Sequence, residues 1–69
     1  MTKLPTSDKV IRVLSNNGFY FKSQKGSHQK YTNGNRIVIV PAPRKEIPVG
    51  TLRSISRQSG LELGEFMNL

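Results

Sequence analysis

The residues best suited to chemistry lie together in the middle of the chain. They read Lys25-Gly26-Ser27-His28-Gln29-Lys30-Tyr31 and include the only histidine of the sequence. Histidine is the side-chain type that titrates near neutral pH. Lysines stand on both sides of it, and a small Gly-Ser pair precedes it, leaving room for a substrate. If the chain is an enzyme, His28 is therefore the expected catalytic residue.

The composition restricts the reaction. One histidine and no cysteine cannot supply the usual zinc ligands, and four acidic side chains in 69 residues are too few and too scattered for a two-metal nuclease. No P-loop or dinucleotide-binding fingerprint is present. We therefore expect no metal and no cofactor. Metal-independent cleavage of RNA remains feasible: a base takes the proton of the 2′-hydroxyl, which attacks the neighbouring phosphate, and a cation stabilises the added charge.

In this scheme His28 is the base or acid, and Lys25 and Lys30 are the nearest cations. Ser27 offers a hydroxyl to a phosphate oxygen. The second acid or base stays open between water, Tyr31 and a lysine. A structural or merely exposed histidine also remains open, since a lone histidine on a strand more often has such a role.

Basic charge is concentrated in the first two thirds of the chain. Lys and Arg number 11 against 4 Asp and Glu, which gives a net charge of +7, and no acidic side chain lies between Asp8 and Glu46. Such a field attracts polyanions, so nucleic acid is the leading partner class. The expected RNA contacts are Lys22, Lys25, Ser27, Lys30 and Arg36. A basic surface kept for solubility, or neutralised by an acidic protein, is the alternative.

Periodicity and turn residues predict one α+β domain over residues 1–69, with helices on one face of a three-stranded antiparallel sheet. The expected elements are a helix from Thr6 or Ser7 to about Asn17, strands over 19–23, 27–32 and 36–40, a helix from Gly50 or Thr51 to Gly60, and a short helix within 62–69. Phe19 and Phe21 are expected to point inward. Asn33-Gly34 predicts a type I′ hairpin turn.

This hairpin determines which side chains share a face. The uncharged set of Tyr31, Val38 and Val40 is expected to face the helices. The opposite face then carries His28, Lys30, Ile37 and Ile39, and its two isoleucines suggest a protein that covers it.

The expected location is the cytoplasm, with no membrane partner. No apolar run approaches the roughly 20 residues of a membrane-spanning helix, and the absence of cysteine fits a reducing compartment. A chain this small has a thin core, which favours a surface site over a deep cavity.

Several motifs in this order resemble the HicA toxin family. They are Gly26-Ser27-His28 after an aromatic strand, Val40-Pro41, Gly50-Thr51-Leu52-Arg53-Ser54-Ile55, and Ser59-Gly60-Leu61 followed by Phe66. The resemblance extends from Leu4 to Phe66. It implies a fold similar to the double-stranded-RNA-binding domain and a toxin–antitoxin mRNA interferase that depends on His28. It also implies a HicB-type antitoxin as protein partner.

The family commonly has a second histidine in a V-P-x-H pattern after the third strand, and here Pro43 stands at that place. The resemblance therefore leaves His28 alone. Two other classes stay open: a non-catalytic RNA-binding module of the same fold, and a protein that acts only through an acidic partner.

Overall fold

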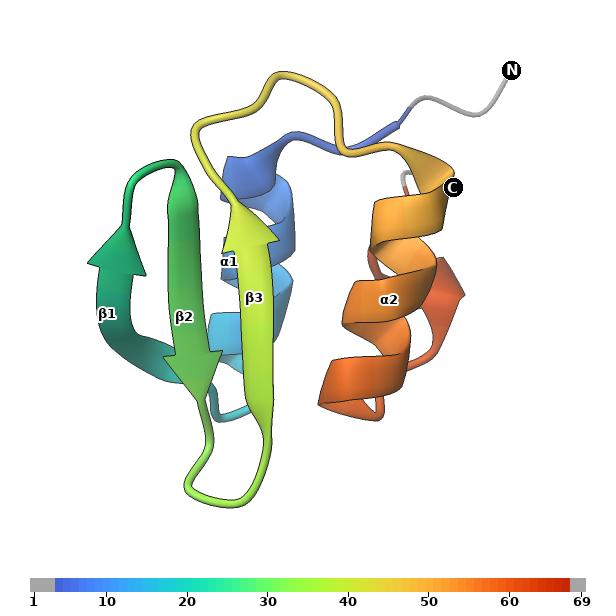
Figure 1. Ribbon diagram of the computed structural model, residues 1–69. Coiled ribbons are helices and arrows are strands. Elements are labelled where there is room, and N and C mark those ends of the chain that lie inside the picture. Colours follow the sequence, from blue (N-terminus) through green and yellow to red (C-terminus); the bar gives the residue numbers. More distant parts are fainter. Residues whose placement is uncertain (1–3, 68–69) are drawn as a thin grey trace.

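The computed structural model describes residues 4–67. Its elements are α1 (Ser7–Asn16), β1 (Tyr20–Lys25), β2 (His28–Thr32), β3 (Ile37–Pro41), α2 (Val49–Ser59) and a 3₁₀ helix, η1 (Leu63–Glu65) (Figure 1). The predicted α-β-β-β-α order and the α+β class are confirmed. The outermost residues of the predicted 1–69 domain lie outside the described range.

Capping residues set the ends of α1. The Thr6 hydroxyl accepts the Lys9 N–H at 3.0 Å, and Asp8 places a negative charge in the first turn. Gly18 follows the helix with a φ of +88°, a backbone conformation that glycine adopts at little cost, as predicted. Val10 and Leu14 form the fully buried stripe of this helix.

The strands form one antiparallel sheet in the order β1-β2-β3 (Figure 1). Tyr31 pairs with Val38, and Lys30 pairs with Ile39. Tyr31, Val38 and Val40 are buried, whereas His28 and Ile37 are exposed, so the predicted assignment of the two faces is confirmed. We call the side that carries His28, Lys30, Ile37 and Ile39 the outer face.

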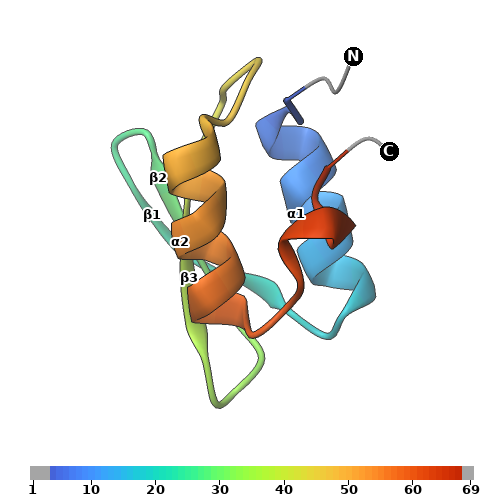
Figure 2. The same ribbon diagram turned by 90° about the vertical axis from the view of Figure 1, so that its right-hand side faces the viewer.

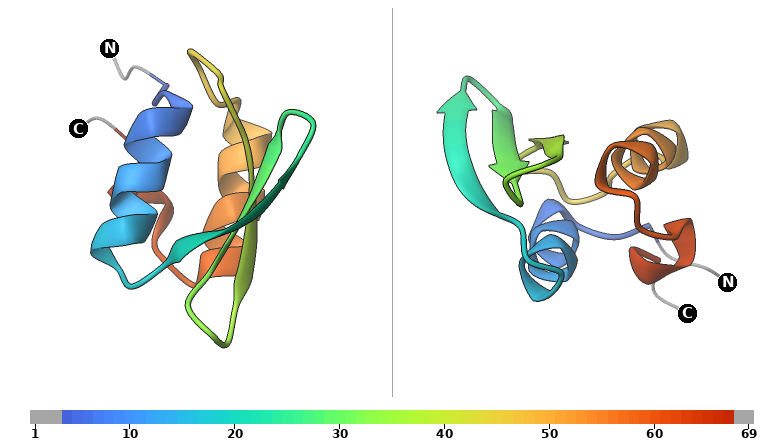
Figure 3. Two further views of the ribbon diagram at one scale, coloured as in Figure 1. Left: turned by 90° about the vertical axis from the view of Figure 1, so that its left-hand side faces the viewer. Right: turned by 90° about the horizontal axis from the view of Figure 1, so that it is seen from below.

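Both helices contribute to one core, with α2 running alongside β3 (Figures 2 and 3). The buried apolar side chains of this core are Val10, Leu14, Phe19, Tyr31, Val38, Val40, Ile47, Leu52, Ile55 and Phe66. The segment that contains η1 lies beside both helices and away from the strands (Figure 3). Among residues 4–67, no helix has the length and apolarity needed to cross a bilayer.

The short helix expected within 62–69 is smaller than predicted. Only the 3₁₀ turn Leu63–Glu65 forms, and residues 68 and 69 lie outside the described range. Phe66 is nevertheless fully buried, as expected, and belongs to the core.

Phe21 is expected to point inward, yet 53% of its surface is exposed. Its ring meets that of Tyr31 edge-on, with centroids 5.9 Å apart, so it does lie on the helix side of the sheet. The helices pack chiefly on β3, and every residue of the edge strand β1 is exposed. Position at the uncovered edge therefore decides the exposure of Phe21.

The turn between β2 and β3 is not type I′. Only Gly34 has a positive φ, of +97°, whereas a type I′ turn needs two such residues. The Asn33 side-chain oxygen accepts the N–H groups of Asn35 and Arg36 at 2.9 and 2.7 Å, and the Thr32 hydroxyl accepts that of Gly34 at 3.0 Å. Side-chain hydrogen bonds thus select a different turn.

Arg36 interacts with the C-terminal end of α2. Its guanidinium donates to the carbonyls of Arg57 and Gln58 at 3.5 and 3.3 Å. A cation is favourable at the end of a helix, where backbone carbonyls lack partners. Gly60 ends the helix with a φ of +78° and leaves space for this guanidinium.

Replacing Gly60 with alanine should lower the free energy of unfolding by more than the ~1–2 kcal/mol that a left-handed residue costs. The added Cβ would lie 3.0 Å from the guanidinium carbon of Arg36. Gly34→Ala is the matched control, because Gly34 also has a positive φ but faces open space. In an Arg36→Ala background, Gly60→Ala and Gly34→Ala should lower the free energy of unfolding by the same amount, within about 0.5 kcal/mol. Unfolding in urea measures both. A larger cost at Gly60 that persists without Arg36 would contradict this contact.

Candidate functional site

The β1–β2 turn places His28 at the end of the sheet. Lys25 pairs with His28 across a two-residue turn, Gly26-Ser27. Gly26 has a φ of +58° and Ser27 does not have a positive φ, which is the pattern of a type II′ turn with glycine first. His28 is therefore the first residue of β2, directly after the turn.

Two hydrogen bonds hold this turn. The Gln24 side chain donates to the carbonyl of Gly26 at 3.0 Å. The Ala42 N–H, just after β3, donates to the carbonyl of Ser27 at 2.8 Å. The turn is thus tied to both neighbouring strands, and the backbone on either side of His28 is fixed.

A β-bulge in β1 determines which side chains accompany His28. Phe21 pairs with Tyr31, but the next pair is Ser23 with Lys30, so Lys22 is an extra residue. Ser23 and Lys25 consequently share a face with Lys30 and His28. The sequence carries no signal for this bulge, and Ser23 was therefore missed as a site residue.

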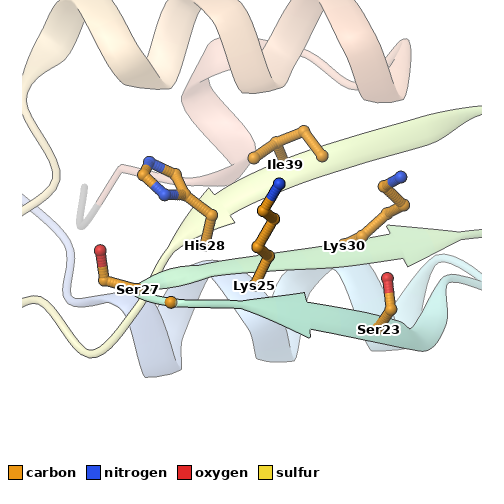
Figure 4. Close-up of a pocket in the computed structure, with 7 residues that line it drawn as sticks. Ser23, Lys25, Ser27, His28, Lys30 and Ile39 are labelled. Atoms are coloured by element: carbon orange, nitrogen blue, oxygen red, sulfur yellow. The ribbon is translucent and has the colours of Figure 1, made fainter.

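These side chains line an open hollow of about 660 Å³ on the outer face, which we call the first hollow. Its lining consists of Ser23, Lys25, Gly26, Ser27, His28, Lys30 and Ile39. Figure 4 shows His28, Lys25, Lys30 and Ile39 projecting from the same side of the sheet, away from α1. The volume falls within the range of small-ligand sites.

The chemical character of the first hollow follows from these groups. Two ammonium groups flank one exposed imidazole, and the hollow has no acidic side chain. The serine hydroxyls add neutral donors, and Ile39 supplies an apolar wall. Such a site can bind an anion and exchange a proton with it.

Tyr31, one of the open choices for a second acid or base, lies on the helix side of the sheet. Only 6% of its surface is exposed, and its hydroxyl donates to the Gln29 side-chain oxygen at 2.7 Å. Burial raises the pKa of the Tyr31 phenol above its usual value, and the negative charge of Asp8 acts in the same direction. This leaves water and the two lysines as the open choices for the second acid or base.

The structure brings together four of the six predicted site residues: Lys25, Ser27, His28 and Lys30. Lys22 is exposed at the bulge, outside the lining of the first hollow. Arg36 lies at the opposite end of β3, where its guanidinium contacts α2. Within residues 4–67, no group of three histidine, cysteine, aspartate or glutamate side chains could hold a metal ion.

The comparisons with known proteins agree with this architecture. The family model described as "HicA toxin of bacterial toxin-antitoxin" matches residues 7–61. No curated protein matches the chain. The matched range begins at α1, includes the Gly26-Ser27-His28 turn and extends just past α2. The chain therefore belongs to the HicA toxin family, the toxins of bacterial toxin–antitoxin systems.

Proposed function

We propose that the chain is a metal-independent endoribonuclease that cleaves mRNA and uses His28 as its acid–base group. The observation that supports this most strongly is the exposure of His28 on the outer face, between two lysines that line the same hollow. Membership of a toxin family agrees with an activity that harms the cell. An mRNA substrate would also account for the excess of positive charge, and it fits a cytoplasmic location.

In the proposed reaction, the neutral imidazole of His28 takes the proton of a ribose 2′-hydroxyl. The 2′-oxygen then attacks the adjacent phosphorus, and the bond to the 5′-oxygen breaks. The products are a 2′,3′-cyclic phosphate and a 5′-hydroxyl, which receives its proton from water or from a lysine. Lys25 and Lys30 stabilise the charge on the phosphoryl oxygens, and Ser27 donates a hydrogen bond to one of them.

Lys22 and Arg36 have a different part in this proposal. Because both lie outside the first hollow, they would meet only the more distant phosphates of a longer RNA. Their contribution would be general attraction of the polyanion rather than contact with the reacting phosphate.

Replacing His28 with alanine should abolish cleavage without unfolding the protein. Loss of a general base costs about 10²–10⁴-fold in rate, whereas an exposed substitution changes stability by only about 0.5 kcal/mol. The assay is cleavage of an RNA in the presence of EDTA, with thermal unfolding as the fold control. RNA with a 2′-deoxy nucleotide at the cleavage site should be cleaved by neither the unaltered chain nor the His28→Ala variant. If the unaltered chain binds RNA but leaves it intact, it is a non-catalytic RNA-binding module instead.

RNA affinity should fall steeply with added salt. For single strands the logarithm of the binding constant changes by about −0.7 per phosphate contact with the logarithm of salt concentration. Lys25→Gln and Lys30→Gln, each measured in a His28→Ala background, should each make this slope less steep by about 0.7, the value for one phosphate contact. Arg12→Gln is the matched control, because Arg12 is an exposed cation on α1, away from the outer face. Equal effects of all three substitutions would mean that only the net charge matters.

A toxin of this family has an antitoxin as its partner. We propose that the antitoxin is of the HicB type and covers the outer face. In support, Tyr20 and Ile37 leave 58% and 47% of their surfaces exposed there, and Tyr20 pairs with Thr32, the residue that also pairs with Ile37. Apolar groups at this exposure suit a protein interface.

Ile37→Asp should weaken the complex with a HicB-type antitoxin by about tenfold or more while the free toxin stays folded. Val49→Asp is the control, since Val49 is 39% exposed but lies on α2. Isothermal titration calorimetry of each purified variant with the antitoxin measures the two affinities. An unchanged affinity for the Ile37 variant would place the antitoxin on another surface.

A further inference from the structure

A second hollow adjoins the first one at His28. Its volume is about 410 Å³, and it lies between β3 and α2. His28 and Ile39 line both hollows, so the imidazole stands where they meet. The side chains that belong to the second hollow alone include Arg44, Thr51, Ser54 and Gln58.

Hydrogen bonds fix the wall of the second hollow. The Ile39 N–H, at the free edge of β3, donates to the Gln58 side-chain oxygen at 2.8 Å. The Gln58 nitrogen donates in turn to the Ser54 hydroxyl at 2.9 Å. Ser54 accepts this bond, so its own proton stays free to be donated to a ligand. The strand edge and the helix thus present a fixed surface with hydroxyl donors.

Arg44 is the cation of the second hollow. Its backbone is anchored to the start of α1: the Arg44 N–H donates to the Ser7 hydroxyl at 3.0 Å, and the Ser7 N–H donates to the Arg44 carbonyl at 2.9 Å. Ser7 is 2% exposed, whereas Arg44 is exposed. The main chain is therefore held while the guanidinium can reach a ligand. No acidic side chain lines the second hollow.

We propose that the second hollow binds a phosphate of the RNA next to the scissile one. This inference rests on the proposed function. A single RNA strand would cross the sheet end at His28, with the scissile phosphate in the first hollow near Lys25 and Lys30. The adjoining phosphate would contact Arg44 and the hydroxyls of Thr51 and Ser54. Arginine suits this place because its planar guanidinium binds phosphate through two parallel hydrogen bonds.

The position of the imidazole between two cationic hollows indicates the substrate class. A strand held by phosphates on both sides of one ribose is fixed at that ribose, which is what attack of its 2′-oxygen requires. The substrate would be single-stranded RNA, since its backbone can turn to bring the attacking and leaving oxygens into line. The smallest fully bound substrate would contain two phosphates.

The experiment compares three short substrates and two variants of Arg44. A dinucleoside monophosphate has only the scissile phosphate, whereas trinucleotides extended at either end have one more. Arg44→Gln should lower kcat/KM roughly tenfold for the trinucleotide extended at the 5′ end, because the added phosphate then flanks the attacking ribose, and should leave the other two substrates unchanged. Arg44→Lys should recover part of the loss, because lysine keeps the charge but not the two parallel bonds.

Lys45→Gln is the matched control. It removes the same charge from the adjacent exposed residue, which does not line the second hollow. Lys45 and Arg44 both line a further hollow beside Thr6 and Asp8, so the two variants differ in the second hollow alone. The inference is overturned if the Arg44 and Lys45 variants behave alike. It is also overturned if Arg44→Gln reduces cleavage of every substrate equally, since Arg44 would then not act on the additional phosphate.

Binding to the His28→Ala protein separates this inference from the proposed nuclease activity. With a trinucleotide that is not cleaved, Arg44→Gln should flatten the dependence of affinity on salt by about 0.7, the value for one phosphate contact. An unaltered chain that cleaves no RNA would overturn the nuclease proposal, but this binding measurement would still show whether Arg44 holds a phosphate. An unchanged salt dependence would overturn the phosphate site itself.

Discussion

Alternation of side chains along β2 is the constraint on which the rest of the structure depends. Tyr31 is buried against the helices, next to the fully buried Val38 of β3. Successive residues of a strand point to opposite faces, so the burial of Tyr31 directs Lys30 and His28 outward. A shift of one residue would exchange the two sets and bury charged groups. The cost of burying those charges holds His28 on the outer face.

The bulge in β1 adapts the edge strand to this arrangement. With regular pairing beyond Phe21, Lys22 would lie opposite Lys30 and Gln24 opposite His28. Like charges directly opposite each other destabilise a sheet. The extra residue places Ser23 opposite Lys30 and Lys25 opposite His28 instead. One inserted residue therefore both separates two lysines and brings a cation to the imidazole.

The sequence predicts what depends on local pattern and on burial. The order of elements, the glycine that ends each helix, and the faces of β2 and β3 follow from periodicity and from the choice of the uncharged set for the core, and all three are confirmed. The place of His28 on the outer face follows from the same choice. The four site residues that line the first hollow are neighbours in the sequence, which made them predictable.

The remaining features depend on contacts that periodicity does not encode. Phe21 is exposed because the helices pack chiefly on β3 and not on the edge strand. The turn after β2 is set by the side chains of Asn33 and Thr32. Charge alone groups Arg36 with the other cations, but its guanidinium reaches the end of α2. Arg44 lines the same hollow as His28, and its backbone is anchored to Ser7, 37 residues earlier, a contact that no local pattern encodes.

The small size of the chain explains why a site of this kind lies on a surface. The core forms on the helix side of the sheet, and the residues of the outer face are not part of it. The first hollow is open, so under the proposed nuclease function much of the positioning of the RNA would come from charged contacts along its strand. Cations on both sides of the imidazole meet this requirement without a larger fold. An exposed site also can be closed by a partner that covers the sheet, without any change in the core that holds the toxin together.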